Sequence, residues 1–392
     1  MDRLREVVAQ IEALALPASA LERDILPARV SGYQPRLLDE LCASGEVAWV
    51  GRGRLGKDDG RVALVPRERL AEFSGVPSAE VEDELQRVVL DLLRRRGALF
   101  FTELVASTMN PAREVLDALW ELAWGGLVNN DTFAPVRALA WPKRTTVAPR
   151  PRSGGLPPEA SGRWSATAIS DSAPPNSTQR AHRLASTLLE RYGVVTRETV
   201  MAEGVDGGFS AVYPVFKAME DGGRIRRGYF VEGLGAAQFA LPGAVERLRA
   251  ERDRPEEPLI VMLAATDPAN PYGATLPWPK RENEQRRQLQ RAAGAQVVLV
   301  DGEAVLYLDR GGRGVTTLPA FDVAVSRELA LGGLLQAVER LGGRGLTVER
   351  IDGLPTGESP IAEAFLAAGF LAGYRGLTYR PATRGVDVAG RR

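Results

Sequence analysis

Apolar residues recur at helical spacing in several stretches of the chain, and each stretch ends in a glycine followed by short alternating segments. Three segments share the order helix, short connection, helix, glycine and hairpin. They are residues 1–75, 76–142 and 178–254. This order is that of a winged helix, whose second helix can enter a major groove while its hairpin wing lies along the backbone. The pattern predicts wings near residues 47–65, 127–139 and 224–240.

The remaining segments have a different pattern. Residues 143–177 are rich in Pro, Ser and Gly, which predicts a linker or surface loop, and Trp164 within them is expected to dock on a neighbouring domain. Residues 255–392 consist of short strands with Gly-rich turns, interrupted by helical patterns at residues 282–293 and 324–341. We predict an α+β protein in which tandem winged helices are followed by a β-barrel domain with helical insertions.

The stretch WVGRGRLGKDDGRVAL, residues 49–64, contains Gly51, Gly56 and Lys57 at the spacing of a nucleotide-binding P-loop. A P-loop also needs a Ser or Thr hydroxyl for Mg²⁺ and a helix that begins at the phosphate. Here Asp58 follows the lysine, and the next segment, RVALV, alternates like a strand. We therefore interpret the stretch as a hairpin wing and expect this chain to bind neither ATP nor Mg²⁺.

Charge balances over the whole chain, with 50 basic and 50 acidic residues, so nucleic-acid contacts must come from local patches. Nearly all basic residues are arginines, which suit bidentate phosphate contacts and base stacking, although genome composition explains such a bias equally well. The candidate DNA contacts lie in the first and third wings and are Arg52, Arg54, Lys57, Arg224, Arg226, Arg227 and Tyr229. The tip of the second wing, NNDTFAP, has no positive charge, so the second unit is expected to be structural.

The scarcity of cysteine and histidine limits the available chemistry. Cys42 is the one cysteine and His182 the one histidine, which excludes an internal disulfide and a Cys/His zinc site built from this chain. His182 lies in an amphipathic helical pattern, where a single histidine is usually structural, so Ser-His-Asp catalysis is disfavoured. The chain has 44% hydrophobic and 26% charged residues but no apolar run of membrane-spanning length and no signal-peptide pattern. We expect a cytoplasmic protein without a membrane partner.

Long phrases of the sequence resemble the C-terminal region of the bacterial large helicase-related proteins, Lhr, in the same order over nearly the whole chain. The phrases are GEVAWVGRGRLGKDDGRVAL, DALWELAWGGLVNNDTFAPVRA, GRWS, GGFSAVYPVFKAMEDGGRIRRGYFVEGLGAAQFALPGAVERLR and AATDPANPYGATLPWP. The resemblance implies an ATP-dependent superfamily 2 helicase that moves 3′ to 5′ on single-stranded DNA. It also implies winged helices followed by a barrel similar to that of AlkZ-type winged-helix DNA glycosylases, and a uracil-DNA glycosylase activity.

The resemblance also implies partners and a place in the cell. These are single-stranded or forked DNA and N-terminal helicase motor domains that would hold ATP and Mg²⁺, with the protein in the bacterial nucleoid and active in DNA repair. No motor motif is found in this chain, and no D-E-x-H box occurs around its one histidine. The alternative is a non-catalytic winged-helix scaffold for protein partners or for homo-oligomer formation.

A DNA glycosylase needs a pocket that stacks a flipped base and a carboxylate that orients water. The loop AATDPANPYGATLPWP offers Asp267 as the first catalytic candidate, with Asn270, Tyr272 and Trp278 as base-pocket candidates. Asp387 in the arginine-flanked tail is the second catalytic candidate. In the alternative interpretation, the Asp-Pro pair begins a turn and the aromatic rings fill the mouth of the barrel.

Overall fold

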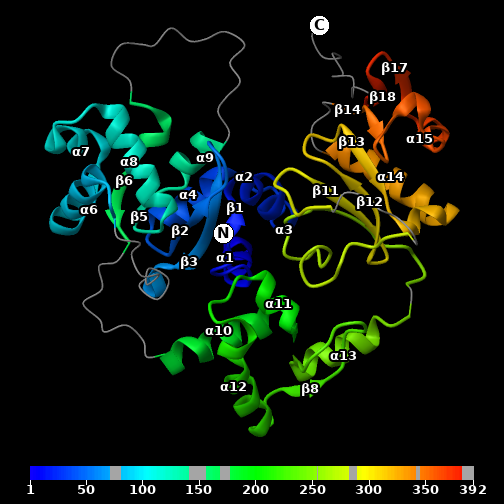
Figure 1. Ribbon diagram of the computed structural model, residues 1–392, viewed down its shortest axis with the longest axis horizontal. Helices are drawn as coiled ribbons and strands as arrows, with labels where there is room; N and C mark the ends of the chain where they lie inside the picture. The colour runs from blue at the N-terminus through cyan, green and yellow to red at the C-terminus, as the bar shows by residue number, and fades with distance from the viewer. Residues whose placement is uncertain are drawn as a thin grey trace, which may run out of the picture. The chain divides into compact units, whose positions relative to one another are not determined.

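The computed structural model describes residues 1–70, 81–140, 156–167, 177–253, 255–281, 289–340 and 345–381. The chain forms two compact units, Met1–Arg247 and Leu248–Arg392, which Figure 1 colours from blue to green and from green to red. None of the described helices has the length and apolarity needed to cross a bilayer. Both units mix helices and strands, and the domain boundaries within the first unit stay a prediction.

The first winged helix contains α1 (Asp2–Gln10), β1 (Leu16–Pro17), α2 (Ala18–Ala20), α3 (Leu26–Arg29), α4 (Pro35–Ala43), β2 (Val47–Arg54) and β3 (Gly60–Pro66). Helix α4 buries Leu38, Leu41 and Cys42 because their spacing places them on one face. Strands β2 and β3 pair antiparallel with Trp49 opposite Leu64, and β1 adds to the free edge of β3. The P-loop-like stretch is therefore a hairpin, as predicted, and a strand follows its glycines.

The middle domain, residues 81–167, contains α6 (Glu84–Arg96), β4 (Leu99–Phe100), α7 (Phe101–Thr108), α8 (Ala112–Trp124), β5 (Val128–Asn130), α9 (Ala134–Ala140) and β6 (Arg163–Ala166). Strand β6 lies between β4 and β5, and Trp164 on it is fully buried. Its ring packs on Trp49 of the first hairpin and on Trp120 of α8. It docks as part of a sheet, so the segment predicted as a linker contributes a strand.

The prediction of a second wing at residues 127–139 is wrong. Strand β5 does not turn back on itself; its partner is β6, and helix α9 is inserted between them. Asn130 accepts a hydrogen bond from the Thr132 backbone N–H and donates one to the carbonyl of Ser161, which turns the chain away from a hairpin. Asn-Asp-Thr before Ala-Pro had indicated a hairpin tip, but proline in the first turn of α9 is equally typical of a helix start.

The third winged helix contains α10 (Ser177–Tyr192), β7 (Val194–Val195), α11 (Arg197–Ala202), α12 (Gly208–Asp221), β8 (Arg226–Gly228) and β9 (Gln238–Ala240) and leads into α13 (Pro242–Ala250). Strand β9 lies between β7 and β8, so the wing and the N-terminal strand form one sheet. Phe216 and Phe239 stack at 5.1 Å between ring centroids in the core beneath that sheet.

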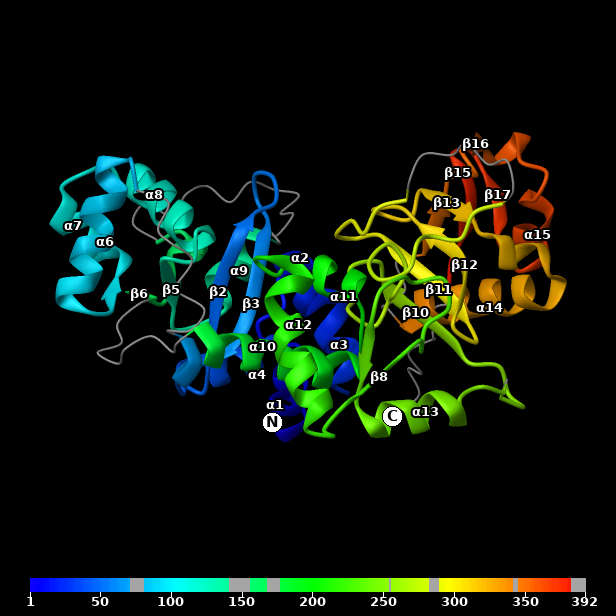
Figure 2. The same ribbon diagram turned by 60° about the horizontal axis from the view of Figure 1, so that its bottom comes forward.

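The hairpin of the first winged helix packs against α8 of the middle domain (Figure 2). Trp49 on β2 lies 6.4 Å from Trp120 and 6.3 Å from Trp164, measured between ring centroids. The approach is close because two glycines face α8. A Cβ at Gly51 would lie 1.9 Å from the carbonyl oxygen of Ala123, and one at Gly60 would meet the ring of Trp124 at 2.4 Å. The first wing is therefore part of the core of this unit.

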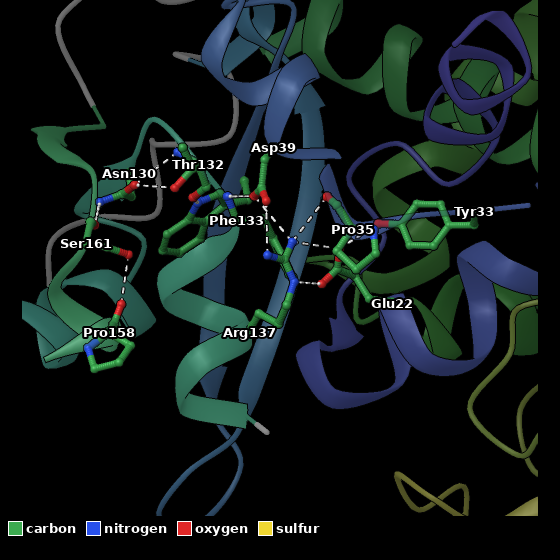
Figure 3. Close-up of polar contacts among 11 residues, drawn as sticks. Glu22, Tyr33, Pro35, Asp39, Asn130, Thr132, Phe133, Arg137, Pro158 and Ser161 are labelled. Carbon is green, nitrogen blue, oxygen red and sulfur yellow. Dashed lines mark hydrogen bonds and ion pairs between the residues drawn. The ribbon is translucent and has the colours of Figure 1, made fainter. Parts of the chain in front are cut away.

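A second joint connects the same two domains through Arg137 of α9 (Figure 3). Its guanidinium donates to the Glu22 carboxylate at 2.6 and 3.0 Å and to the Asp39 carboxylate at 3.0 and 3.3 Å. The Glu22 side chain is fully buried and also accepts from the Tyr33 hydroxyl at 2.6 Å. Burial lowers the pKa of Arg137, but its bonds to the two carboxylates outweigh this, so that pKa is raised.

The C-terminal unit contains β10 (Ile260–Ala264), β11 (Gln296–Val300), β12 (Glu303–Leu308), β13 (Gly314–Thr317), α14 (Ala324–Arg340), β14 (Leu346–Val348), β15 (Arg350–Ile351), β16 (Leu354–Pro355), α15 (Ala362–Ala367), β17 (Leu371–Gly373) and β18 (Gly376–Tyr379). Six strands follow the order β10-β11-β12-β13-β15-β16, and β14-β18-β17 form a second sheet. Within the described residues no pairing joins β10 to β16, so the predicted barrel closure stays a prediction.

The two helical patterns predicted in this unit have different outcomes. The pattern at residues 324–341 is confirmed as α14, which packs on β10, β11 and β12. Of residues 282–293, the first seven lie outside the described residues, and residues 289–293 are not helical. There the backbone carbonyl of Gln290 accepts from the Tyr307 hydroxyl at 3.0 Å, a tertiary contact that a sequence period cannot reveal.

We expect Arg137→Met to destabilise the N-terminal unit by about 3–5 kcal/mol, because it leaves the buried Glu22 carboxylate without its counter-charge. Thermal unfolding measures the loss. The matched control is Arg163→Met, which removes a pair between Arg163 and Asp131 whose arginine side chain is 55% exposed, and should cost under about 1 kcal/mol. Equal losses in the two variants would contradict the role assigned to the buried network.

Candidate nucleic-acid interface

Helices α11 and α12 form the helix-turn-helix of the third winged helix. The turn between them contains Gly207 at φ +75°, a left-handed conformation that glycine adopts without strain. On α12, Val212 and Phe216 face the core and are buried, whereas Pro214 and Lys217 are exposed. The helix therefore presents an exposed surface with a lysine, in the position that a recognition helix uses in DNA-binding winged helices.

The wing of this domain is the β8–β9 hairpin, as predicted, with Arg227 opposite Phe239. Its nine-residue loop, residues 229–237, is held by the fully buried side chain of Gln238. The amide oxygen of Gln238 accepts from the backbone N–H groups of Phe230 and Val231, both at 2.8 Å. Its amide nitrogen donates to the carbonyls of Val231 and Leu234. One side chain at the end of the loop thus holds the first six residues of the loop in place.

Two arginines on β8 point out of the sheet beside acidic neighbours. The nearest nitrogen–oxygen distance is 3.2 Å between Arg227 and Glu220 and 3.9 Å between Arg226 and Glu246. The arginine side chains are 49% and 55% exposed, respectively. Exposed pairs of this kind contribute little to stability, so a phosphate can replace either carboxylate at small cost.

Tyr229 lies two positions after Arg227 and is 87% exposed. An aromatic side chain in that environment gains nothing from burial, and its ring faces are open to a partner. Arg224 is exposed in the turn between α12 and β8. The structure therefore brings the four residues predicted in the third wing together on one exposed hairpin and the turn before it.

The predicted contacts of the first wing lie in a different environment. Arg54 forms an ion pair with Glu121 of α8 and donates to the carbonyls of Gly56 and Lys57, so it holds the tip of its own hairpin. Arg52 is half-buried. Burial lowers its pKa, and the negative charge of Asp206, which acts in the opposite direction, only partly offsets this. Of the three predicted residues, Lys57 alone projects from the tip as an exposed cation free of ion pairs within the described residues, so this wing offers less charge than its sequence indicated.

The exposed face of α8 in the middle domain is acidic. Arg113 lies among Glu114, Asp117 and Glu121, and the other faces of the helix are buried by the first hairpin and by the sheet of this domain. A helix with a net negative exposed face repels phosphates. The structural role expected of the second unit agrees with this arrangement.

Asp267 and Asn270 lie in the loop after β10 and are 1% exposed. The Asp267 carboxylate accepts from the backbone N–H of Ala269 at 2.8 Å, and Asn270 donates to the carbonyl of Ala265 at 3.0 Å. Arg291 donates to the carbonyls of Asp267 and Asn270 from the other side. Side-chain-to-backbone bonds of this kind stabilise a turn, and a catalytic role for Asp267 stays a prediction.

The two aromatic base-pocket candidates stack on each other. The ring centroids of Tyr272 and Trp278 are 6.0 Å apart, and Trp278 also meets Tyr307 edge-on at 5.4 Å. The Tyr272 hydroxyl donates to the carbonyl of Gly302 at 3.0 Å. The structure therefore brings the predicted loop residues together as a packed cluster, whereas Asp387, the second carboxylate candidate, lies outside the described residues.

An open groove of about 450 Å³ lies beside α10 and contains the single histidine. His182 and Arg183 are exposed there, facing Glu68 and Arg69 after the first hairpin. Arg69 forms an ion pair with the nearly buried Glu12 at 2.5 Å, so this arginine belongs to a joint within the unit. The groove is lined by Glu68 and Glu190 as well as by Arg69 and Arg183, and this balance of charge gives it no preference for DNA.

Sequence reasoning missed two residues of the third winged helix, Lys217 on α12 and Gln238 on β9. Lys217 was detectable, because it lies opposite the apolar stripe of α12. Gln238 had no signal, since a glutamine within GAAQFAL reads as a surface position of a strand. Its role depends on a loop that folds back over it.

Residues 1–67 and residues 174–259 each match the family described as large helicase-related protein, winged-helix domain. The chain is related to the Lhr proteins. The "Lhr helicase/ probable uracil glycosylase" of Mycolicibacterium smegmatis is 43% identical over 411 residues, which cover 97% of this chain and 27% of that protein. The "Lhr helicase/uracil glycosylase" of Escherichia coli K12 is 35% identical over 410 residues, which cover 97% and 26%.

The chain thus spans about a quarter of the length of these curated Lhr relatives. Among solved structures, the Streptomyces sahachiroi DNA glycosylase AlkZ is similar at 18% identity and a TM-score of 0.47, with 89% of this chain and 98% of that chain covered. The resemblance to Lhr read from the sequence phrases is confirmed.

We expect Gln238→Leu to loosen the wing loop, because the N–H groups of Phe230 and Val231 lose their acceptor. Hydrogen exchange at these two amides should accelerate, and the domain should lose about 1–3 kcal/mol of stability. Glu232→Gln, an exposed change in the same loop, is the control and should leave both unchanged. Unaltered exchange in Gln238→Leu would show that the loop is held by other contacts.

Proposed function

We propose that this chain is a DNA-binding region of an Lhr-type ATP-dependent 3′-to-5′ DNA helicase that acts in DNA repair. The proposal rests on the third wing. Its hairpin exposes Arg226, Arg227 and Tyr229, and the side chain of Gln238 holds its loop. This hairpin lies within residues 174–259, which match an Lhr winged-helix domain. ATP and Mg²⁺ would be bound by motor domains of a longer protein and not by this chain.

The chemistry of the wing suits a single strand or a fork. Each arginine can neutralise one phosphate after leaving Glu220 or Glu246, and the open ring of Tyr229 can stack on an unpaired base. Stacking needs a base that is not already stacked within a duplex. Lys217 on α12 adds a contact to the backbone next to the wing.

We also propose that the chain excises uracil from DNA, because both curated relatives carry uracil glycosylase in their names. Water would add to the sugar C1′ while the bond to the base breaks, and a carboxylate would orient that water. Asp267 is the first candidate and Asp387 the second. Closure of the C-terminal strands into a barrel would give this chemistry an enclosed site.

The alternative is a scaffold that assembles copies of the chain or binds proteins through its winged helices. It requires no DNA. Salt-dependent DNA binding separates the two functions, because contacts to phosphates release counterions from the DNA and a scaffold needs no such contacts.

We expect Arg226→Ala/Arg227→Ala to weaken DNA binding for all sequences alike and to reduce the slope of log affinity against log salt by up to about 1.4 for a single strand, at about 0.7 per phosphate. Fluorescence anisotropy over a salt series measures both. The charge-matched control is Arg94→Ala/Arg95→Ala on α6 of the middle domain, where both arginines are exposed. Unchanged affinity in the wing variant, with the fold intact, would favour the scaffold.

We expect Asp267→Asn to reduce release of uracil from a uracil-containing strand by about 10²- to 10⁴-fold, the usual effect of removing a general base. Asparagine can form the same turn to Ala269, so the melting temperature and DNA affinity should stay near those of the unmodified chain. Asp387→Asn is tested in parallel. Loss in that variant alone would move the site to the tail, and full activity in both would remove support for a carboxylate mechanism.

A further inference from the structure

Two of the eight tyrosines of the chain are exposed, and each lies at a β-hairpin beside an arginine. Tyr229 on the third wing is 87% exposed, and Tyr374 in the C-terminal unit has a relative exposure of 105%. Arg227 precedes the first by two positions, and Arg375 directly follows the second. The same pair of side-chain types is thus presented twice, in two separate units.

The second hairpin is formed by β17 and β18, with Leu371 opposite Thr378 and Gly373 opposite Gly376. Tyr374 and Arg375 are the two residues at its tip. Figure 1 shows the hairpin in red beside α15, at an edge of its unit.

The base of this hairpin is fixed. Gly376 has φ +134°, and a Cβ there would lie 2.1 Å from the carbonyl oxygen of Val348, so the strand passes tightly against β14. Phe370 and Leu377 are buried in the core, and the Tyr379 hydroxyl donates to Glu339 at 2.6 Å. The tip is therefore presented by a rigid scaffold, which lowers the entropy lost when it binds a partner.

The tip itself makes no contact that explains its residues. Leu371 is 70% exposed, and within the described ranges neither Tyr374 nor Arg375 has a hydrogen bond, ion pair or ring contact. Folding gains nothing from an aromatic ring held in water. A protein interface of standard size needs about 800 Å² on each partner, far more than a two-residue tip supplies. A base and its phosphate match one ring and one guanidinium.

We propose that the β17–β18 tip is a second contact for single-stranded DNA, in which Tyr374 stacks on a base and Arg375 binds the adjoining phosphate. This inference rests on the proposed DNA-binding function and extends it to the C-terminal unit. Leu371, on the strand below the tip, supports the stacked base with apolar surface.

The test measures the affinity of the full chain for an oligothymidylate strand by fluorescence anisotropy. Tyr374→Ala should weaken binding by about 5- to 150-fold, the usual range for losing one stacked base. Tyr374→Phe should retain the affinity because it keeps the ring face, whereas Tyr374→Leu should behave like the alanine variant. Arg375→Ala should lower the salt slope by about 0.7.

Two controls keep the outcomes separate. Met109→Ala removes another exposed apolar side chain, 91% exposed in the middle domain, and should have no effect. Binding to a duplex of equal length should be insensitive to Tyr374→Ala, because duplex bases are already stacked. Equal losses on strand and duplex, or equal affinity of the alanine and phenylalanine variants, would overturn the stacking role.

The result also distinguishes this inference from the proposed function. If the unmodified chain does not bind the strand, both fail together. If the chain binds, and Arg226→Ala/Arg227→Ala weakens it while the Tyr374 and Arg375 variants do not, only the second contact is overturned. Thermal unfolding of each variant checks that the fold is kept.

Discussion

The architecture of the N-terminal unit depends on the burial of Trp49 against α8. The indole donates to the carbonyl of Thr132 at 3.0 Å and lies between the rings of Trp120, Trp164 and Phe133. Large aromatic rings bury much apolar surface and gain further from edge-on packing. This packing requires a hairpin that can approach α8 at backbone distance, which is why glycine occupies the two facing positions in β2 and β3.

That packing determines which winged helix remains available to a partner. A wing buried against a neighbouring helix cannot lie along a nucleic-acid backbone, so the hairpin of the first winged helix has become an element of the core. In the middle domain, helix α9 is inserted where a wing would lie, and Arg137 on that helix forms the ion pairs with the first winged helix. The third winged helix keeps both its helix face and its hairpin exposed, and its buried glutamine keeps the loop ordered without covering the arginines.

Arginine has two roles in this chain that composition cannot distinguish. Arg137 and Arg191 hold domains together. Arg137 bridges two carboxylates, and Arg191 pairs with Glu203 while donating to the backbone carbonyls of Gln10 and Glu12, at and just after the end of α1. Arg226 and Arg227 are exposed and weakly paired, as binding to phosphate requires. The difference is burial, because a guanidinium removed from water must satisfy its donors inside the protein, whereas an exposed one can exchange partners.

The sequence by itself determined the helix-turn-helix patterns of the first and third winged helices, the hairpins of their wings, helix α14 and the resemblance to Lhr proteins. These follow from local periodicity, turn chemistry and long matching phrases, which need only neighbouring residues. The tertiary structure decided that Arg54 is bound internally, that β5 pairs with β6, that Gln238 holds a loop, and that Tyr272 and Trp278 stack on each other. Each of these depends on a partner that the fold brings close, because whether a polar or aromatic side chain faces solvent or a neighbour is set by three-dimensional packing and not by its position in the chain.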